Sequence, residues 1–271
     1  MSASYQFAVL TNDYQDSKKV ALSLKQKLKK IKAKENNVSP DLVFIIGGDG
    51  TFLKGVNKYN QHLDRVKFIT FKQGKIGFYH NFAITDVDRV VEALANDADK
   101  LVVNELDLLE VEMNSKILYA INEVRLVNFS QTLRCDVLLN NELLQVFSGS
   151  GLIFSTKTGS TGLMKTAGGA VILSSARLME YQELFPVNNN MHRSLRAPLI
   201  LDYNQVVTLK LQATEKEKLS NNHLVVDTFD FYDKLVSEIK VKISNQTLKI
   251  FAFKTNNISL IKKLNNSFIQ F

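Results

Sequence analysis

The sequence predicts an α/β domain followed by an all-β domain. Three observations lead to this prediction: strands and helices alternate up to about residue 100, closely spaced strands follow, and the breaks between those later strands are short and polar. The length of 271 residues suits one large domain or two modest ones. We expect the α/β domain at 1–100, the β-rich domain at 101–254 and a C-terminal tail at 255–271.

The first domain should contain a parallel sheet, because helices join its successive strands. We expect its strands at 7–10, 41–46 and 66–71 and its helices at 17–34, 51–59 and 86–96. The strand at 41–46 is continuously apolar, as expected when both faces of a sheet are covered. The helices at 17–34 and 86–96 repeat apolar residues at helical spacing, which predicts one buried face on each.

The second domain should consist of strands joined by short turns. We expect strands at 101–113, 116–128, 134–140, 142–149, 151–156, 206–212, 223–231, 238–244 and 248–254. Asn140 and Asn141 separate two of these runs and predict a hairpin turn, because Asn tolerates a positive φ. The tail at 255–271 should be helical or irregular and fold back.

The chain is basic, with a net charge of +7 and a pI of about 9.3. Much of the excess is lysine between residues 17 and 34, where Val20, Leu24 and Leu28 recur at helical spacing. We interpret these lysines as the solvated face of an amphipathic helix. No aromatic residue lies among them, so a base-stacking surface for nucleic acid is not indicated.

Cysteine usage and hydropathy exclude several further classes. The single cysteine, Cys135, cannot form an intramolecular disulfide, and its apolar surroundings predict a core thiol. It and the four scattered histidines have no zinc-type spacing. The N-terminus lacks the apolar stretch of a signal peptide, and no run approaches the roughly 20 apolar residues of a membrane span. We expect a cytoplasmic protein with no nucleic-acid or membrane partner.

Residues 41–51, DLVFIIGGDGT, lead from a buried strand into three glycines around one acid. Ligands of open α/β sheets bind at the carboxyl ends of strands. Gly47, Gly48 and Gly50 would let the backbone approach a ligand, and the N–H groups that start the next helix attract phosphate. Asp49 would hold a metal or accept a proton. A tight turn in which Asp49 caps the helix explains one or two of these glycines, but not easily three.

Two familiar phosphate-binding motifs do not fit this turn. Leu53 stands where the dinucleotide pattern G-x-G-x-x-G needs its last glycine, and Val56 stands where the P-loop needs its lysine. The turn is therefore neither a Rossmann dinucleotide fingerprint nor a Walker A loop.

Two polar stretches in the β-rich region are further candidates. Residues 155–169, STKTGSTGLMKTAGG, concentrate hydroxyl groups and glycines after an apolar strand. They suit a sugar and phosphate ligand, although an ordinary helix-capping loop explains them as well. Asn122 and Glu123 lie in an otherwise apolar strand, where a buried carboxylate needs partners. Either they mark a solvated strand edge, or Glu123 accepts hydrogen bonds from a diol such as ribose.

Taken in order, these stretches resemble the three signature stretches of the NAD kinase family. They are GGDGT at 47–51, Asn122 with Glu123, and STKTGST at 155–161, and GKIGFYHNF at 74–82 resembles a further family segment. The resemblance covers nearly the whole chain. Lipid kinases and phosphofructokinases share a version of GGDGT, whereas the other two stretches favour NAD kinases.

The resemblance implies a Rossmann-like N-terminal domain and a β-sandwich C-terminal domain, with the site between them and a tail that returns to the first domain. It also implies transfer of the γ-phosphoryl group of ATP, or in some members of polyphosphate, to the adenosine ribose 2′-hydroxyl of NAD. Such enzymes need a divalent cation, usually Mg²⁺, which we expect the phosphates to hold rather than a dedicated protein site. Family members are usually homodimers or homotetramers.

The family's functional residues carry over to matching positions of this chain. Asp49 would be the general base at the 2′-hydroxyl or would position it, since a carboxylate can accept the hydroxyl proton. Asn122 and Glu123 would bind the adenosine part of NAD. The other nucleotide-binding residues would be Gly47, Gly48, Gly50, Thr51, Ser150, Thr158, Thr161, Gly162, Leu163 and Thr166.

The chain departs from the family pattern around the third stretch. Ser148 and Ser150 replace a basic residue and an aspartate implicated in holding the nicotinamide end, and Lys157 replaces a proline. Gly162 and Leu163 stand where the family commonly has a base-stacking tyrosine, a loss of about 1–3 kcal/mol by analogy with other stacked bases. Two alternatives therefore stay open: a catalytically weak nucleotide-binding sensor, and a diacylglycerol-type lipid kinase.

Overall fold

The computed structural model describes residues 5–72, 78–212, 222–231, 237–256 and 260–265. The chain forms two compact units, one of Met1–Leu106 with Thr247–Phe271 and one of Asp107–Gln246. The domain limits expected at residues 100 and 254 stay predictions, and the expected tail falls partly outside the described residues. No helix in the described ranges is long and apolar enough to cross a membrane.

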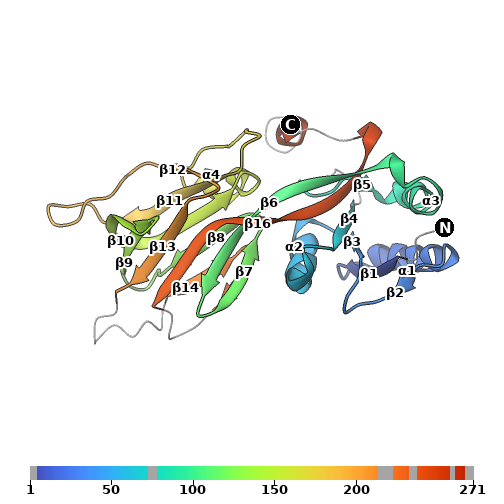
Figure 1. The fold of residues 1–271 in the computed structure, drawn as a ribbon, viewed down its shortest axis with the longest axis horizontal. Helices are drawn as coiled ribbons and strands as arrows, with labels where there is room; N and C mark the ends of the chain where they lie inside the picture. The colour runs from blue at the N-terminus through green and yellow to red at the C-terminus, as the bar shows by residue number, and fades with distance from the viewer. Residues whose placement is uncertain (1–4, 73–77, 213–221, 232–236, 257–259, 266–271) are drawn as a thin grey trace. The chain divides into compact units, whose positions relative to one another are not determined.

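The first unit is built on a parallel sheet, as the alternation of strands and helices predicts (Figure 1). Its strands are β1 (Gln6–Thr11), β2 (Lys34–Glu35), β3 (Leu42–Ile46), β4 (Lys67–Lys72) and β5 (Phe82–Ala83). They follow the order β2-β1-β3-β4, and β4 also pairs in parallel with β5 and with the end of the long strand β16 (Glu238–Phe253). The carboxyl ends of β1, β3 and β4 therefore share one edge of the sheet.

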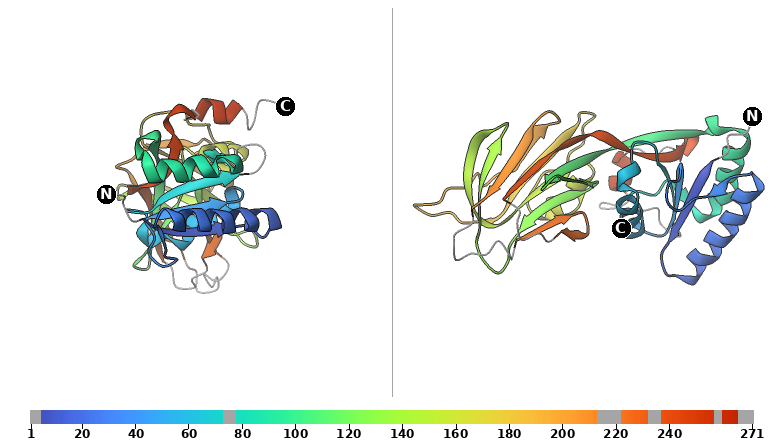
Figure 2. Two further views of the ribbon diagram at one scale, coloured as in Figure 1. Left: turned by 90° about the vertical axis from the view of Figure 1, so that its right-hand side faces the viewer. Right: turned by 60° about the horizontal axis from the view of Figure 1, so that its bottom comes forward.

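Helices flank this sheet. They are α1 (Gln15–Lys30), α2 (Asp49–Lys58) and α3 (Val87–Asn96), with the short 3-10 turns η1 (Asn60–His62), η2 (Ile84–Asp86) and η3 (Ala98–Lys100), and later η6 (Lys254–Asn256) and α5 (Leu260–Leu264). α1 lies beside β1 (Figure 2) and buries Leu24 and Leu28, while α3 buries Val90 and Leu94. The buried faces predicted from helical spacing are confirmed.

Three predicted helix boundaries are wrong by two residues or more, and the first is the start of α1, which lies at Gln15 instead of residue 17. α1 ends at Lys30 instead of residue 34, because Lys32 adopts a left-handed conformation with a φ of 65° and the chain then enters β2. α2 begins at Asp49 instead of residue 51, because the extended residue that precedes the helix is Gly48, with a φ of −101°. Asp49 therefore lies in the first helical turn, where the positive end of the helix dipole favours a carboxylate.

The second unit is built from antiparallel strands. They are the part of β6 (Leu101–Met113) from Asp107 onward, β7 (Lys116–Ala120), β8 (Glu123–Val127), β9 (Leu133–Leu139), β10 (Glu142–Thr156), β11 (Leu178–Pro186), β12 (Leu199–Asp202), β13 (Val206–Leu211), β14 (His223–Val226) and β15 (Phe229–Phe231), together with the first part of β16. Their inward side chains form a separate apolar core that includes Val124, Phe154 and Tyr181. Cys135 is buried in this core as a free thiol, as predicted.

β10 organises the second unit. Its first half pairs with β9, whereas residues 151–155 lie between β8 and β11. The two strands predicted at 142–149 and 151–156 are therefore one strand. Gly151 permits the close packing there, because a Cβ at this position would lie 2.6 Å from the carbonyl oxygen of Leu126.

Other strand predictions need smaller corrections. The run 116–128 is not one strand, because a turn at Ile121 and Asn122 separates β7 from β8. Conversely, the runs at 238–244 and 248–254 form the single strand β16, and 223–231 forms the hairpin of β14 and β15. The hairpin turn at Asn140 and Asn141 is confirmed, with φ values of 51° and 69°.

Candidate functional site

The glycine turn lies where β3 ends and α2 begins. A Cβ on Gly47 would lie 2.4 Å from the Oγ1 of Thr51, so the turn can close only with glycine there. At Gly48 and Gly50 a Cβ would meet no atom within 4 Å. The backbone is therefore open on this side to a ligand, beside the N–H groups that begin α2.

A hollow of about 560 Å³ opens beside the glycine turn. It lies at the carboxyl ends of the central strands of the first unit and is lined by Asn12, Tyr14, Gln15, Asp16, Ser17, Gly47, Gly48, Lys72 and Ile84. Lys72 places a positive charge on the wall of this hollow, and Gly47 and Gly48 expose their backbone to it. This combination of charge and free backbone suits a phosphorylated ligand.

Asp49 has one buried side and one open side. Its Oδ1 lies 3.1 Å from Nδ1 of the buried His80 and accepts a 3.4 Å hydrogen bond from the Tyr79 N–H, yet its side chain is 41% exposed. Burial alone would raise the pKa of Asp49, but His80, the Tyr79 N–H and the Lys72 charge together lower it below its ordinary value. The carboxylate is thus ionised and within reach of solvent.

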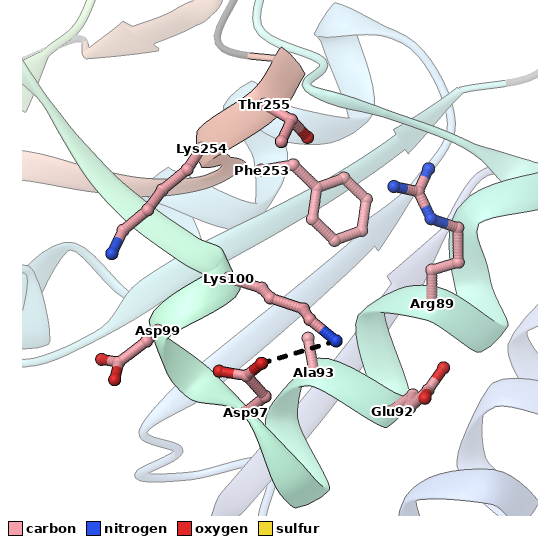
Figure 3. A pocket seen from close by; sticks show the side chains of 9 residues that line it. All are labelled: Arg89, Glu92, Ala93, Asp97, Asp99, Lys100, Phe253, Lys254 and Thr255. Carbon is pink, nitrogen blue, oxygen red and sulfur yellow. Dashed lines mark ion pairs between the residues drawn. The ribbon is translucent and has the colours of Figure 1, made fainter.

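A second hollow, of about 520 Å³, lies elsewhere in the first unit, near the end of α3 (Figure 3). Its wall includes the guanidinium of Arg89, 4.4 Å from the centre of the Phe253 ring, and an ion pair of 3.4 Å between Lys100 and Asp97. None of the residues predicted to act in the site lines it. Its mixed charges indicate no particular ligand.

In the second unit, Asn122 lies in the turn before β8, and Glu123 is the first residue of β8. The carboxylate of Asp227 accepts hydrogen bonds from three successive backbone N–H groups in this turn, those of Ile121 at 3.0 Å, Asn122 at 2.8 Å and Glu123 at 3.2 Å. Asp227 itself sits between β14 and β15 with a φ of 53°. Sequence reasoning missed Asp227, and its only signal is an acid between two short apolar runs.

Glu123 and Asp227 form a buried acidic pair beside Arg125. Burial and the Asp227 charge raise the pKa of Glu123 to about 7, against the opposing charge of Arg125. Burial raises the pKa of Asp227 as well, to about 6, although the three N–H groups that it accepts and the charge of Arg125 oppose that rise, so Asp227 is the more readily ionised member of the pair. The expectation of a solvated strand edge is therefore wrong for Glu123, which is only 9% exposed.

The loop that follows β10 is joined directly to this turn. The hydroxyl of Thr156 donates to the carbonyl of Ile121 at 2.5 Å and accepts from the N–H of Gly159 at 3.0 Å. Gly159 rests on the backbone of Asn122 so closely that a Cβ would lie 1.9 Å from its carbonyl oxygen. The structure thus brings together two of the three stretches singled out in the sequence.

Except for Ser150, the remaining predicted residues are distributed along this loop. Thr158 precedes the 3-10 turn η4 (Gly159–Thr161), and the Thr161 hydroxyl donates to the Thr158 carbonyl at 3.0 Å. The short helix α4 (Leu163–Thr166) follows, with Gly162 and Leu163 exposed and the Thr166 hydroxyl bonded to the Leu163 carbonyl at 2.8 Å. Ser150 stands apart from the loop, within β10, where its carbonyl accepts the Asn128 N–H at 2.9 Å.

Comparison with known proteins gives a consistent result. No family model matches the sequence. The chain is 32% identical over 252 residues to a protein named NAD kinase from Latilactobacillus sakei, with 91% of each chain covered. It is 35% identical over 201 residues to a protein of the same name from Lactobacillus acidophilus, with 73% of this chain and 75% of that one covered.

Two solved structures share the fold of this chain. The yeast NADH kinase complexed with NADH superposes with a TM-score of 0.79 at 18% identity, covering 98% of this chain and 88% of that one. An Archaeoglobus fulgidus NAD kinase in complex with ATP gives a TM-score of 0.68 at 18% identity over 97% of both chains. At this identity the likeness establishes the fold, and the predicted fold class, α/β followed by a β-sandwich, is confirmed.

Proposed function

The chain belongs to the NAD kinase family, and on this premise we propose that it transfers the γ-phosphoryl group of ATP, or of polyphosphate, to the adenosine ribose 2′-hydroxyl of NAD. The observation that carries this proposal is the ionised Asp49 carboxylate, which is open on one side at the start of α2. A positioned carboxylate is what a hydroxyl needs when it attacks a phosphoryl group.

In the proposed reaction Asp49 accepts the proton of the 2′-hydroxyl as the oxygen attacks the γ-phosphorus. The bond between the γ-phosphorus and the bridging oxygen breaks, and ADP leaves with the bonding electrons. The glycine turn of Gly47, Gly48, Gly50 and Thr51, with Lys72 nearby, approaches the phosphates of the donor. This role is supported by the open backbone of the turn and by the hollow beside it.

A divalent cation completes the proposed reaction. Mg²⁺ usually takes one or two carboxylates and the phosphates of its substrate, and within the described residues no cluster of three or more His, Cys, Asp or Glu groups is placed to hold a metal. We assign Mg²⁺, or another divalent cation, to the phosphates of ATP as part of this proposal. Bound there, it neutralises negative charge that develops on the phosphoryl oxygens.

The second unit supplies the proposed binding site for NAD. Asn122 and Glu123 hold the adenosine part, and Thr158 and Thr161 line the adenine pocket. The loop residues Gly162, Leu163 and Thr166 extend this pocket, and Ser150 faces the nicotinamide end. The hydrogen bonds from Thr156 to the turn and from the turn to Asp227 support this assignment, because they hold both stretches in fixed positions.

Further features follow from the same family membership. We propose a Rossmann-like domain at 1–100, an NAD-binding domain at 101–254, and a tail at 255–271 that packs on the first domain. We also propose a homodimer or homotetramer. A cytoplasmic location is favoured by the free, buried thiol of Cys135.

Formation of NADP from NAD tests this proposal directly. The purified chain is incubated with NAD, Mg²⁺ and either ATP or polyphosphate, and NADP is measured with an NADP-specific dehydrogenase. We expect NADP with at least one donor. If no NADP forms while a reference NAD kinase is active in the same assay, the proposal fails. Tight nucleotide binding without turnover would instead favour the alternative function, a catalytically weak nucleotide-binding sensor.

A further inference from the structure

His80 is a buried histidine that the proposed reaction has not used. Its side chain is 0% exposed, and neither ring nitrogen makes a hydrogen bond of regular geometry within the described residues. A buried polar group without partners is costly. The group it approaches is Asp49, whose Oδ1 lies 3.1 Å from its Nδ1.

The backbone around His80 is fixed on both sides. The Thr70 hydroxyl donates to the Tyr79 carbonyl at 2.8 Å and accepts from the Asn81 N–H at 3.3 Å. The Tyr79 ring packs against Phe52 of α2, with their centres 4.9 Å apart. These contacts tie the segment to β4 and to α2, so the imidazole is aimed at Asp49 by the fold.

The two ends of this pair lie in different surroundings. His80 is completely buried, whereas the Asp49 side chain is 41% exposed. Both contacts described for the carboxylate, from His80 and from the Tyr79 N–H, fall on Oδ1. Within the described residues Oδ2 is therefore the oxygen left for a ligand.

We propose that His80 is a positioning residue for phosphoryl transfer, which holds Asp49 by Oδ1 so that Oδ2 faces the acceptor hydroxyl. The proposal rests on the proposed function, because it assigns His80 a part in that reaction. An imidazole in this place also favours the ionised form of Asp49. The titratable groups that act on Asp49 in the described structure are His80, from the segment after β4, and Lys72, from the end of β4.

Kinetics of His80 variants test this role. His80→Gln keeps a side-chain N–H for Oδ1 without the imidazole, and His80→Leu removes both the N–H and the imidazole. We expect kcat to fall about tenfold or more in His80→Leu and less in His80→Gln, while KM for NAD changes little. The matched control is His62→Gln on η1, which should leave kcat unchanged.

The pH profile separates positioning from a merely structural role. Burial raises the pKa of Asp49, and His80 opposes that rise, so the pKa of Asp49 should be higher when His80 is removed. The acidic limb of kcat/KM should therefore move to higher pH in His80→Leu, and activity should recover partly as pH increases. Folded variants with unchanged kcat and an unmoved acidic limb would overturn the proposal.

A spectroscopic measurement decides the question if the variants do not fold. The ¹⁵N resonances of the His80 imidazole are recorded in the wild-type chain and in Asp49→Asn, where the charge of the carboxylate is lost. Changed resonances are expected, and identical ones would overturn the pairing. A wild-type chain that forms no NADP contradicts the proposed function itself, whereas an active chain with unaffected His80 variants contradicts only the role of His80.

Discussion

The Asp49 carboxylate has one oxygen, Oδ1, held by His80 and the Tyr79 N–H, and a second oxygen, Oδ2, left for a ligand. Asn at this position keeps the shape and can still accept the Tyr79 N–H, but it cannot take up a proton. We expect Asp49→Asn to lower kcat for NADP formation by about 10²-fold or more and to retain NAD binding. Coupled assays and calorimetry measure the two quantities. A variant that retains most of its turnover would show that Asp49 is not the base.

Glu123 makes the stability of the chain depend on pH. Its pKa is about 7 in the folded chain, above the ordinary value of 4.5, so the folded chain holds this proton more tightly than the unfolded chain. The resulting stabilisation is fully present below pH 4.5 and is lost as pH rises through about 7.

The side chain in Glu123→Gln cannot ionise, so this variant should not lose that stabilisation as pH rises. Between pH 5 and 8 we expect its free energy of unfolding to fall less than that of the wild type, by on the order of 1–3 kcal/mol. Urea denaturation at both pH values measures the difference. Glu142→Gln, at an exposed position of β10, is the control and should follow the wild type. Parallel pH curves for Glu123→Gln and the wild type would contradict the prediction.

At the scale of elements, the loop after β10 depends on its contact with the turn before β8. Gly159→Ala would place a Cβ 1.9 Å from the carbonyl oxygen of Asn122, and the atoms that it meets are backbone atoms, which leave little room to relax. We expect a loss of several kcal/mol in stability and weaker NAD binding. Thermal denaturation and calorimetry measure both. Gly50→Ala, whose Cβ meets open space in α2, should not lose stability.

The hairpin of β14 and β15 holds the same turn from its other side through Asp227. Asp227→Ala removes the acceptor of two buried N–H groups and one partly buried N–H group, and we expect a loss of about 2–4 kcal/mol in stability. Amide hydrogen exchange at residues 121–123 should become faster than in the wild type, whereas exchange at residues 124–127 of β8 should change less. Asp230→Ala, in the same hairpin but exposed, is the control. Unchanged exchange at 121–123 would show that Asp227 does not order the turn.

The elements that the sequence predicted well are those that local patterns determine. The apolar run before Gly47 and the helical spacing of Val90 and Leu94 depend on neighbours a few positions away. The joining of two predicted strands into β10 and the break at Asn122 depend on which distant strands pair with them. Local periodicity contains no information about those partners.

The same reason explains which parts of the candidate site were missed. The glycine turn and the Asn122 turn stand out as departures from an apolar pattern. Asp227 acts on Asn122 across 105 positions, and His80 acts on Asp49 across 31, so each is recognised only once the fold is known. Contacts that position functional groups are the least visible part of a site in a single sequence.

For the whole molecule, NAD and ATP should each stabilise the folded chain by mass action. A ligand at one hundred times its Kd adds about 2.7 kcal/mol if it binds only the folded state. We expect NAD to raise the Tm of the wild type and of Asp49→Asn alike, because Asn at 49 removes chemistry and not the adenosine site. Asp227→Ala should show a smaller rise at the same NAD concentration, since its 121–123 turn is no longer held. A rise in Tm for the wild type that disappears in Asp49→Asn would assign Asp49 to binding instead.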